Sequence, residues 1–307
     1  MTSTASSTDE FLRFVQAGGK VEAQDEMPDA YRQDILRIAS QQAIAEIVGA
    51  EMFAEWVDAA PTLERKAMLL AKIQDEIGHG HVNMRVCEDL GRSREQIMED
   101  YLDGRIHLLN TFHYEFQSWP EIATARVLMT GAALVQFQSL VNGSYQPYVR
   151  ALKKILKEES FHYHEAVDLT LMLLVHGSAE QRRELQQGID LWYPRVLAYF
   201  GPSDKQSVHS ERMLGYRLKV HTNDDMRQHW LSKVVPLVRS MGLSIPDEEL
   251  VQVAPGVWSY TQPEWSEVKA VIKGGGPASA RRREQAARYY EDAAWVRETL
   301  SSAPLAA

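Results

Sequence analysis

Two glutamate–x–x–histidine pairs constrain this 307-residue chain more than any other feature: Glu76 with His79, and Glu159 with His162. Each pair lies in a long stretch whose apolar residues recur with helical spacing. Residues three positions apart share one face of a helix, so each pair directs a carboxylate and an imidazole to the same side. Both groups are common metal ligands. The sequence therefore predicts two helices that present metal ligands.

A third carboxylate, Glu46, occupies the middle of another helical stretch, among alanine, isoleucine and valine. A buried charge in such surroundings is costly unless a cation neutralises it. Antiparallel pairing of this helix with the next one would bring Glu46 close to Glu76. A single Glu-x-x-His pair arises about once by chance in a chain of this composition. Two pairs together with Glu46 make a metal centre the favoured interpretation over histidines with a purely structural role.

Each motif glutamate follows another carboxylate: Asp75 precedes Glu76, and Glu158 precedes Glu159. A metal-bound histidine usually donates its second ring N–H to a carboxylate, which holds the ring in orientation. We therefore predict that Asp75 contacts the histidine of the opposite motif, His162, and that Glu158 likewise contacts His79.

The pattern predicts an all-α fold: a ferritin-like four-helix bundle with additional C-terminal helices. Bundle helices are expected over residues 29–57, 61–91, 120–140 and 145–175, with Pro61 at the first helical position and a long crossover before the third helix. Residues 1–24 are predicted to be a disordered leader, residues 25–200 the di-iron bundle, and residues 201–307 a helical extension. Residues 242–262 are expected to be irregular or to hold a short hairpin, and a charged terminal helix is expected from about residue 278.

Composition limits the classes of function. The net charge of −9 argues against nucleic acid as a partner. Cys87 is the only cysteine, which excludes an internal disulfide and a cysteine-rich zinc or iron–sulfur site, and favours a reducing cytoplasm. No apolar run reaches the length of a transmembrane helix, so no membrane association is expected.

Several strings resemble the catalytic subunits of bacterial phenylacetyl-CoA epoxidases, over about residues 21–300. These strings are MPDAYR (27–32), AEIVG (45–49), APTLERK (60–66), LAKIQDEIGH (70–79), KEESFH (157–162), FGP (200–202), TND (222–224) and WVR (295–297). The resemblance implies a non-haem di-iron monooxygenase that uses O₂ to epoxidise the aromatic ring of an aryl-CoA thioester. It also implies a separate reductase with flavin and iron–sulfur centres that supplies electrons from NADPH, together with two further partners: a small accessory protein and a non-catalytic ferritin-like subunit.

The resemblance also implies roles for individual residues. Two irons per chain are expected, and their ligands fall on Glu46, Glu76, His79, Glu159 and His162. The positions that face CoA and substrate fall near Arg37, Gln41, Lys72, His107 and Phe112. His107 stands where the family more often has a lysine, and Lys72 precedes Glu76 by one helical turn. Lys72, Asp75 and Glu158 are the residues expected to act beside the metal; for Lys72, an ordinary surface lysine is an equally good interpretation.

One position departs from the family. Members carry an aspartate just before a Gly-Ala-Ala string in the third bundle helix, where this chain has Thr130, and no carboxylate lies between Glu121 and Glu158. A neutral hydroxyl is a poor iron ligand, so the second iron is expected to bind more weakly. Water, hydroxide or a substrate carboxylate filling the gap is the favoured outcome. An empty or differently occupied second position, a paralogous oxygenase with another substrate, and a non-catalytic ferritin-like partner subunit remain alternatives.

Overall fold

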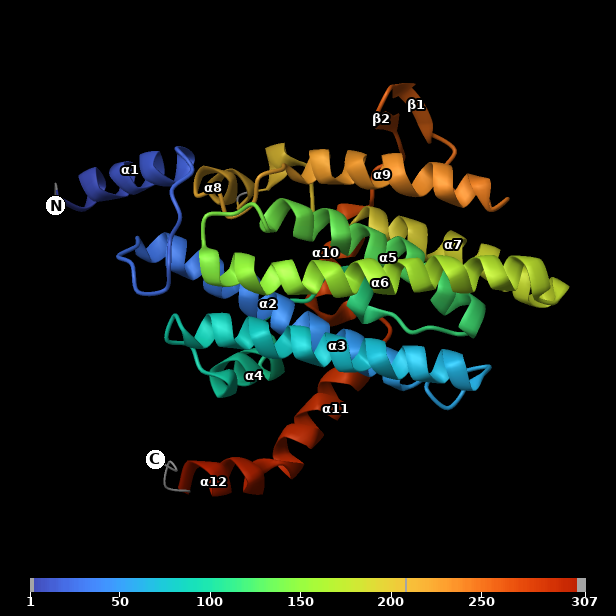
Figure 1. The fold of residues 1–307 in the computed structure, drawn as a ribbon, viewed down its shortest axis with the longest axis horizontal. Coiled ribbons are helices and arrows are strands. Elements are labelled where there is room, and N and C mark those ends of the chain that lie inside the picture. Colours follow the sequence, from blue (N-terminus) through green and yellow to red (C-terminus); the bar gives the residue numbers. More distant parts are fainter. Residues whose placement is uncertain (1–2, 208, 303–307) are drawn as a thin grey trace.

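The computed structural model describes residues 3–207 and 209–302, and its centre is a bundle of four long helices (Figure 1). These are α2 (Asp29–Ala54), α3 (Leu63–Glu88), α5 (Trp119–Leu140) and α6 (Gln146–His176). Helix α2 packs against α3, α5 packs against α6, and α3 meets α6 across the bundle. The predicted all-α, ferritin-like fold is confirmed.

The ends of the bundle helices follow local capping chemistry. The hydroxyl of Thr62 accepts the backbone N–H of Arg65 at 3.2 Å and makes Thr62 the N-cap of α3. Pro61 therefore precedes the cap, and its predicted place at the first helical position is wrong by two residues. Ser118 caps α5 in the same way through the N–H of Glu121. Helix α2 ends at Ala54, three residues before the predicted end.

The connection between α3 and α5 is the long crossover that the sequence predicts. It contains α4 (Arg94–Leu102) and a short 3₁₀ helix, η1 (Asn110–His113). Helix α4 begins with a capping box between Ser93 and Gln96 and packs on α2 and α3. The crossover carries α5 to the far side of the bundle, so that α5 and α6 face α2 and α3 (Figure 1).

A second layer of helices covers α5. It consists of α7 (Ala179–Leu197) and α9 (Asn223–Ser240), joined through η2 (Asp204–Gln206) and α8 (Ser210–Gly215). Trp192 of α7 and Trp230 of α9 are fully buried in one core cluster with Leu128 of α5. Residues before and after the boundary predicted at residue 201 therefore pack in the same core.

The C-terminal region contains the predicted hairpin and terminal helices. Strands β1 (Val251–Ala254) and β2 (Val257–Ser259) pair antiparallel, and Trp258 is buried against α9. Helix α10 (Trp265–Ala270) and the π-helical turn η3 (Val271–Gly275) lead to α11 (Ser279–Asp292) and α12 (Ala294–Ser302), which extend away from the bundle (Figure 1). The buried guanidinium of Arg282 anchors α11 by donating to the carbonyl groups of Phe112 and Tyr114.

The N-terminal segment differs from the prediction of a disordered leader over residues 1–24, of which residues 1–2 lie outside the described residues. Helix α1 covers Ser3–Gln16, and Val15 and Val21 are buried. The Phe11 ring packs edge-on against Tyr31, with ring centroids 4.8 Å apart. The few apolar residues of this segment are enough to attach it to the bundle. The prediction of disorder is wrong because it relies on the serine- and threonine-rich composition of the segment.

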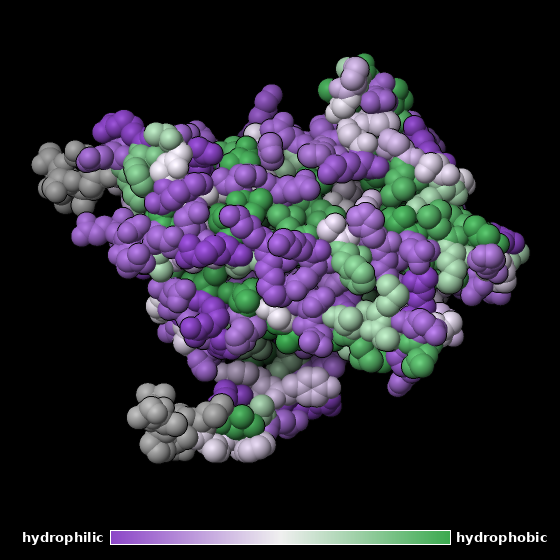
Figure 2. Space-filling view, in the orientation of Figure 1, coloured by the Kyte–Doolittle hydropathy of each residue, from purple (hydrophilic) through white to green (hydrophobic). Residues whose placement is uncertain are grey.

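The surface over α3 and α6 is mainly hydrophilic, with apolar side chains more frequent toward the end of the bundle where α6 meets α7 (Figure 2). Leu171 and Val175 are among the exposed apolar residues of α6. Among the residues that the structure describes, none of the helices combines the length and apolar character needed to cross a bilayer.

Candidate metal centre

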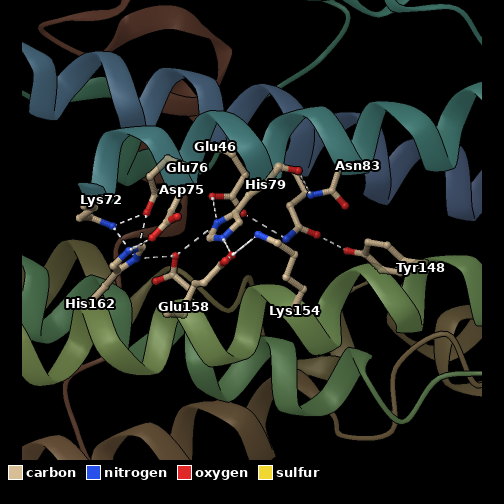
Figure 3. A network of polar contacts seen from close by, with 12 residues as sticks. Glu46, Lys72, Asp75, Glu76, His79, Asn83, Tyr148, Lys154, Glu158 and His162 are labelled. Carbon is tan, nitrogen blue, oxygen red and sulfur yellow. Dashed lines mark hydrogen bonds and ion pairs between the residues drawn. The ribbon is translucent and has the colours of Figure 1, made fainter. Parts of the chain in front are cut away.

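Four predicted ligands converge between three helices of the bundle. Figure 3 labels Glu46, Glu76 and His79 among them. Glu46 comes from α2, Glu76 and His79 from α3, and Glu159 from α6. One ligand atom of each residue lies within 4.8 Å of the corresponding atom of every other residue in the group. All four side chains are buried, so three carboxylates and one imidazole share a small volume with little access to water.

Close contact between α2 and α3 brings Glu46 and His79 together. A Cβ atom on Gly80 would lie 2.9 Å from Cγ1 of Ile47 and 3.1 Å from the carbonyl oxygen of Ala43. Only glycine fits at this approach without a shift of α2. The residue next to His79 thus determines how near the two ligand-bearing helices can come.

The orientation of His79 points to a cation. Its Nε2–H donates to Oε2 of Glu158 at 2.8 Å, as predicted, so in the neutral ring the lone pair is on Nδ1. Nδ1 is buried without a hydrogen-bond partner and lies 3.7 Å from Oε2 of Glu46 and 3.6 Å from Oε1 of Glu159. Lone pairs of nitrogen and oxygen thus face one another, and a positive ion between them satisfies all of them. The residues present fit a metal ion at this position.

The pKa shifts show the same preference for positive charge. Burial raises the pKa of the Glu46 carboxyl, and the nearby Glu76 raises it further. Burial alone would lower the pKa of His79, but the nearby carboxylates of Glu46, Glu76 and Glu159 outweigh it and raise the pKa to about 9. The cluster therefore attracts a proton or a metal ion.

The fifth predicted ligand, His162, lies on the other side of Glu159. Its Nε2–H donates to Oδ2 of Asp75 at 3.1 Å, as predicted from the residue order. Its Nδ1 lies 3.3 Å from Oε1 of Glu159 and 3.5 Å from Oε1 of Glu76. The two histidine ring centroids are 6.3 Å apart, with the carboxylate of Glu159 between the rings. This arrangement resembles a centre with two metal positions, one beside each histidine.

The His162 side is electrostatically different from the His79 side. The Lys72 ammonium, 4% exposed, donates to Oε1 of Glu76 and to Nδ1 of His162 at 3.4 Å. Lys72 is therefore a buried residue of the centre, and its interpretation as a surface lysine is wrong. Burial lowers the pKa of His162, and Lys72 lowers it further, to about 4, even though Glu76 and Asp75 act in the opposite direction. Thr130, the residue that departs from the family, is also buried.

A cavity of about 130 Å³ lies beside the cluster. Its wall is largely apolar and includes Met52, Phe53, Leu109, Met129 and Phe137. Three residues of the cluster, Glu46, Glu76 and Glu159, also line it, together with Lys72 and Thr130. A ligand in this cavity would therefore contact the carboxylates directly.

The residues predicted to face substrate lie in different places. Gln41 and Phe112 line the cavity. Arg37 is not among the lining residues; its guanidinium is half-exposed and lies 3.5 Å from Oδ1 of Asp34. His107 has an exposed side chain, and its carbonyl accepts a hydrogen bond from Nε2 of Gln41 at 2.5 Å. With Lys72, the structure thus brings three of the five residues predicted to face substrate to the cavity wall.

Sequence reasoning missed several polar residues of the site. Nε2 of Gln42 donates to Oε1 of Glu46 at 3.2 Å, and the Tyr148 hydroxyl donates to Oε1 of Gln42. Arg126 lines the cavity and is 3% exposed. Gln42 precedes Glu46 by four residues, so the i, i+4 spacing on a helix could have identified it.

Comparison with known proteins identifies the family to which the chain belongs. The sequence profile of a family described as "Phenylacetic acid catabolic protein" matches residues 1–295. The chain is also 41% identical, over 280 residues, to one subunit of the 1,2-phenylacetyl-CoA epoxidase of Escherichia coli (strain K12). That alignment covers 91% of this chain and 90% of the relative, and so includes every bundle helix.

Proposed function

Because the chain belongs to the family of phenylacetic acid catabolic proteins, we propose that it is an oxygenase subunit that epoxidises the aromatic ring of an aryl-CoA thioester. Phenylacetyl-CoA is the first candidate substrate, since it is named in the relative. The observation that carries the proposal is the position of Glu46, Glu76 and Glu159 in the wall of a mainly apolar cavity. A metal ion held there would face the bound substrate.

The cavity suits an aromatic ring. Its volume of about 130 Å³ is close to the roughly 150 Å³ of an engineered apolar cavity that binds benzene. Phe53 and Phe112 offer rings against which an aryl group can pack. The apolar wall also excludes water from the side of the cluster that substrate would approach.

Residues around the cluster hold the ligands in orientation. Glu158 accepts from His79 and keeps Nδ1 directed at the carboxylates. Gln42 donates to Oε1 of Glu46, and Tyr148 in turn donates to Gln42, so the Glu46 carboxylate is held through the oxygen other than the one nearest His79. These contacts fix the donor set before a metal binds, which favours binding.

Iron is the metal that we propose, because carboxylate and imidazole donors suit Fe(II). When bound, the metal supplies the reductive activation of O₂ that the side chains alone cannot perform. The sequence predicts two irons per chain, NADPH as the electron source through a separate flavin and iron–sulfur reductase, and a non-catalytic ferritin-like subunit with a small accessory protein. The relative is itself one subunit of an enzyme, which supports a multicomponent assembly. A cytoplasmic location remains the prediction from the single cysteine.

Turnover of phenylacetyl-CoA tests the proposal. The iron-loaded chain, assayed with its cognate reductase and partner subunits, should consume NADPH and O₂ and yield a product one oxygen atom heavier than the substrate. Glu159→Gln should abolish product, whereas Glu180→Gln, a change at an exposed residue of α7, should not. Absence of oxygenated product from a fully metal-loaded assembly would rule the proposal out for this substrate.

A second candidate is a non-catalytic ferritin-like subunit. Thr130 and the buried Lys72 favour it, because both weaken the His162 side of the centre. Metal content separates the two candidates: a scaffold that has lost its centre should retain no metal after anaerobic loading and desalting.

A further inference from the structure

The second position of the centre already holds a fixed cation among its carboxylates. The ammonium nitrogen of Lys72 contacts both Glu76 and Nδ1 of His162, the two groups that would bind a metal there (Figure 3). It also lies 5.0 Å from the centroid of the Phe53 ring, so an aromatic face closes its other side. Lys72 thus takes the space in front of His162 and satisfies the lone pair of Nδ1.

Arg126 adds a second fixed cation behind His162. Its Nη2 donates to the backbone carbonyl of His162 at 3.3 Å and contacts Oε2 of Glu165. Oε1 of Glu165 is held at 2.9 Å by Arg65, so this carboxylate is shared by two arginines. Arg126 lies one helical turn before Thr130 and, like Thr130, in the cavity wall. The helix that would supply a carboxylate to the second metal therefore supplies a guanidinium and a neutral hydroxyl.

Charge neutrality distinguishes one metal ion from two. The three buried carboxylates Glu46, Glu76 and Glu159 carry three negative charges. The Lys72 ammonium together with one divalent ion balances them. A second divalent ion would exceed this balance even when the partly exposed Asp75 carboxylate beside His162 is counted, and uncompensated buried charge is strongly unfavourable.

We infer that this chain binds one divalent metal ion, ligated by Glu46, Glu76, His79 and Glu159, and that Lys72, supported by Arg126, takes the place of a second ion. The inference rests on the metal centre of the proposed function, which it deepens, and departs from the two irons that the sequence predicts. The donor set of one imidazole and three carboxylates suits Fe(II), Mn(II) or Zn(II). His162, held by Asp75 and Lys72, is then a structural residue of the centre.

Manganese(II) titration of the full-length chain tests the inference, because electron paramagnetic resonance distinguishes isolated from paired ions. Wild type should bind one equivalent and give an isolated six-line spectrum at saturation. His162→Ala should still bind one equivalent, whereas His79→Ala should bind none. Two equivalents with an exchange-coupled spectrum in wild type, or loss of the single ion in His162→Ala, would overturn the inference.

A double variant tests the role of the cation. Lys72→Met with Thr130→Asp removes the ammonium and restores a carboxylate on α5, so it should bind two equivalents and show coupling. Lys153→Met, a change at an exposed lysine of α6, is the control and should bind one equivalent. A folded double variant that still binds one ion would contradict the role given to Lys72. Circular dichroism checks whether the double variant folds. If the double variant does not fold, the titration of the wild type decides the stoichiometry.

The outcome for function is separate. Wild type that binds one ion and fails to oxygenate any aryl-CoA thioester would end the proposed function and leave the inference intact. Wild type that binds two ions and turns over phenylacetyl-CoA would support the proposed function and overturn the inference.

Discussion

Replacing Glu158 by glutamine isolates the charge that orients His79. The Glu158 carboxylate accepts from Nε2 of His79 at 2.8 Å, and the amide oxygen of glutamine can still accept this hydrogen bond. Loss of a carboxylate that supports a ligand histidine typically weakens metal binding by about 10- to 100-fold. The Glu158 side chain is 27% exposed and is shared with Lys154, which lies 2.6 Å from Oε1. Both features reduce its influence, so we expect about a tenfold loss, or ~1.4 kcal/mol.

Thermal or chemical unfolding at a fixed metal concentration measures this loss. A ligand present at about 100 times its Kd stabilises the fold by ~2.7 kcal/mol, and a tenfold weaker affinity halves that gain. The matched control is Asp75→Asn, which makes the corresponding change at His162, where the contact is 3.1 Å. Because His162 is not a ligand of the single ion, Asp75→Asn should alter affinity by no more than about twofold.

Two results would refute this reasoning. Equal losses in the two variants would mean that both histidines ligate metal, and that the centre is symmetric. An unchanged affinity in Glu158→Gln would mean that the charge of Glu158 does not support His79 as a ligand. Isothermal titration with Mn(II) checks the affinities independently of protein stability.

Three further predictions concern pH, packing and the cavity. In the metal-free protein the carboxylates raise the pKa of His79 to about 9, so a metal ion must displace a proton from His79 in order to bind. The affinity of the protein for the metal ion should therefore rise by up to about tenfold per pH unit between about pH 7 and 9. A calorimetric pH series measures this rise. Trp192→Phe leaves the buried Glu121 without the indole N–H that lies 2.7 Å from its carboxylate, and should lower the free energy of unfolding by about 1–3 kcal/mol, whereas exposed Trp295→Phe should change it little in urea titrations. Ala133→Leu adds bulk to the cavity wall and should reduce kcat/KM for phenylacetyl-CoA by about tenfold or more (~1.4 kcal/mol) with metal content unchanged.

Much of the centre follows from residue spacing alone. The i, i+3 motifs predict that carboxylate and imidazole share a helix face, and the order of Asp75 and Glu158 predicts their contacts across the bundle. Both contacts are present, at 3.1 and 2.8 Å. Such features are predictable because helix geometry fixes them locally, and because antiparallel neighbours need only approximate register.

The features that sequence reasoning missed depend on tertiary packing. Arg126 lies in an apolar stretch of α5, a helix buried on nearly all sides, so periodicity does not show which face meets the cavity. Its burial depends on Glu165, which is 39 positions away in the chain and on another helix. Lys72 is ambiguous for a similar reason, since a lysine stem can reach either solvent or an interior carboxylate from the same backbone position.

The central claim is that Glu46, Glu76, His79 and Glu159 bind a metal ion between α2, α3 and α6. An anomalous difference map from crystals of the chain grown with Fe(II) or Mn(II) tests it most directly. We predict a peak about 2.1 Å from Nδ1 of His79 and at bonding distance from an oxygen of each carboxylate. A map with no peak among these four side chains, at full metal loading, would contradict the account.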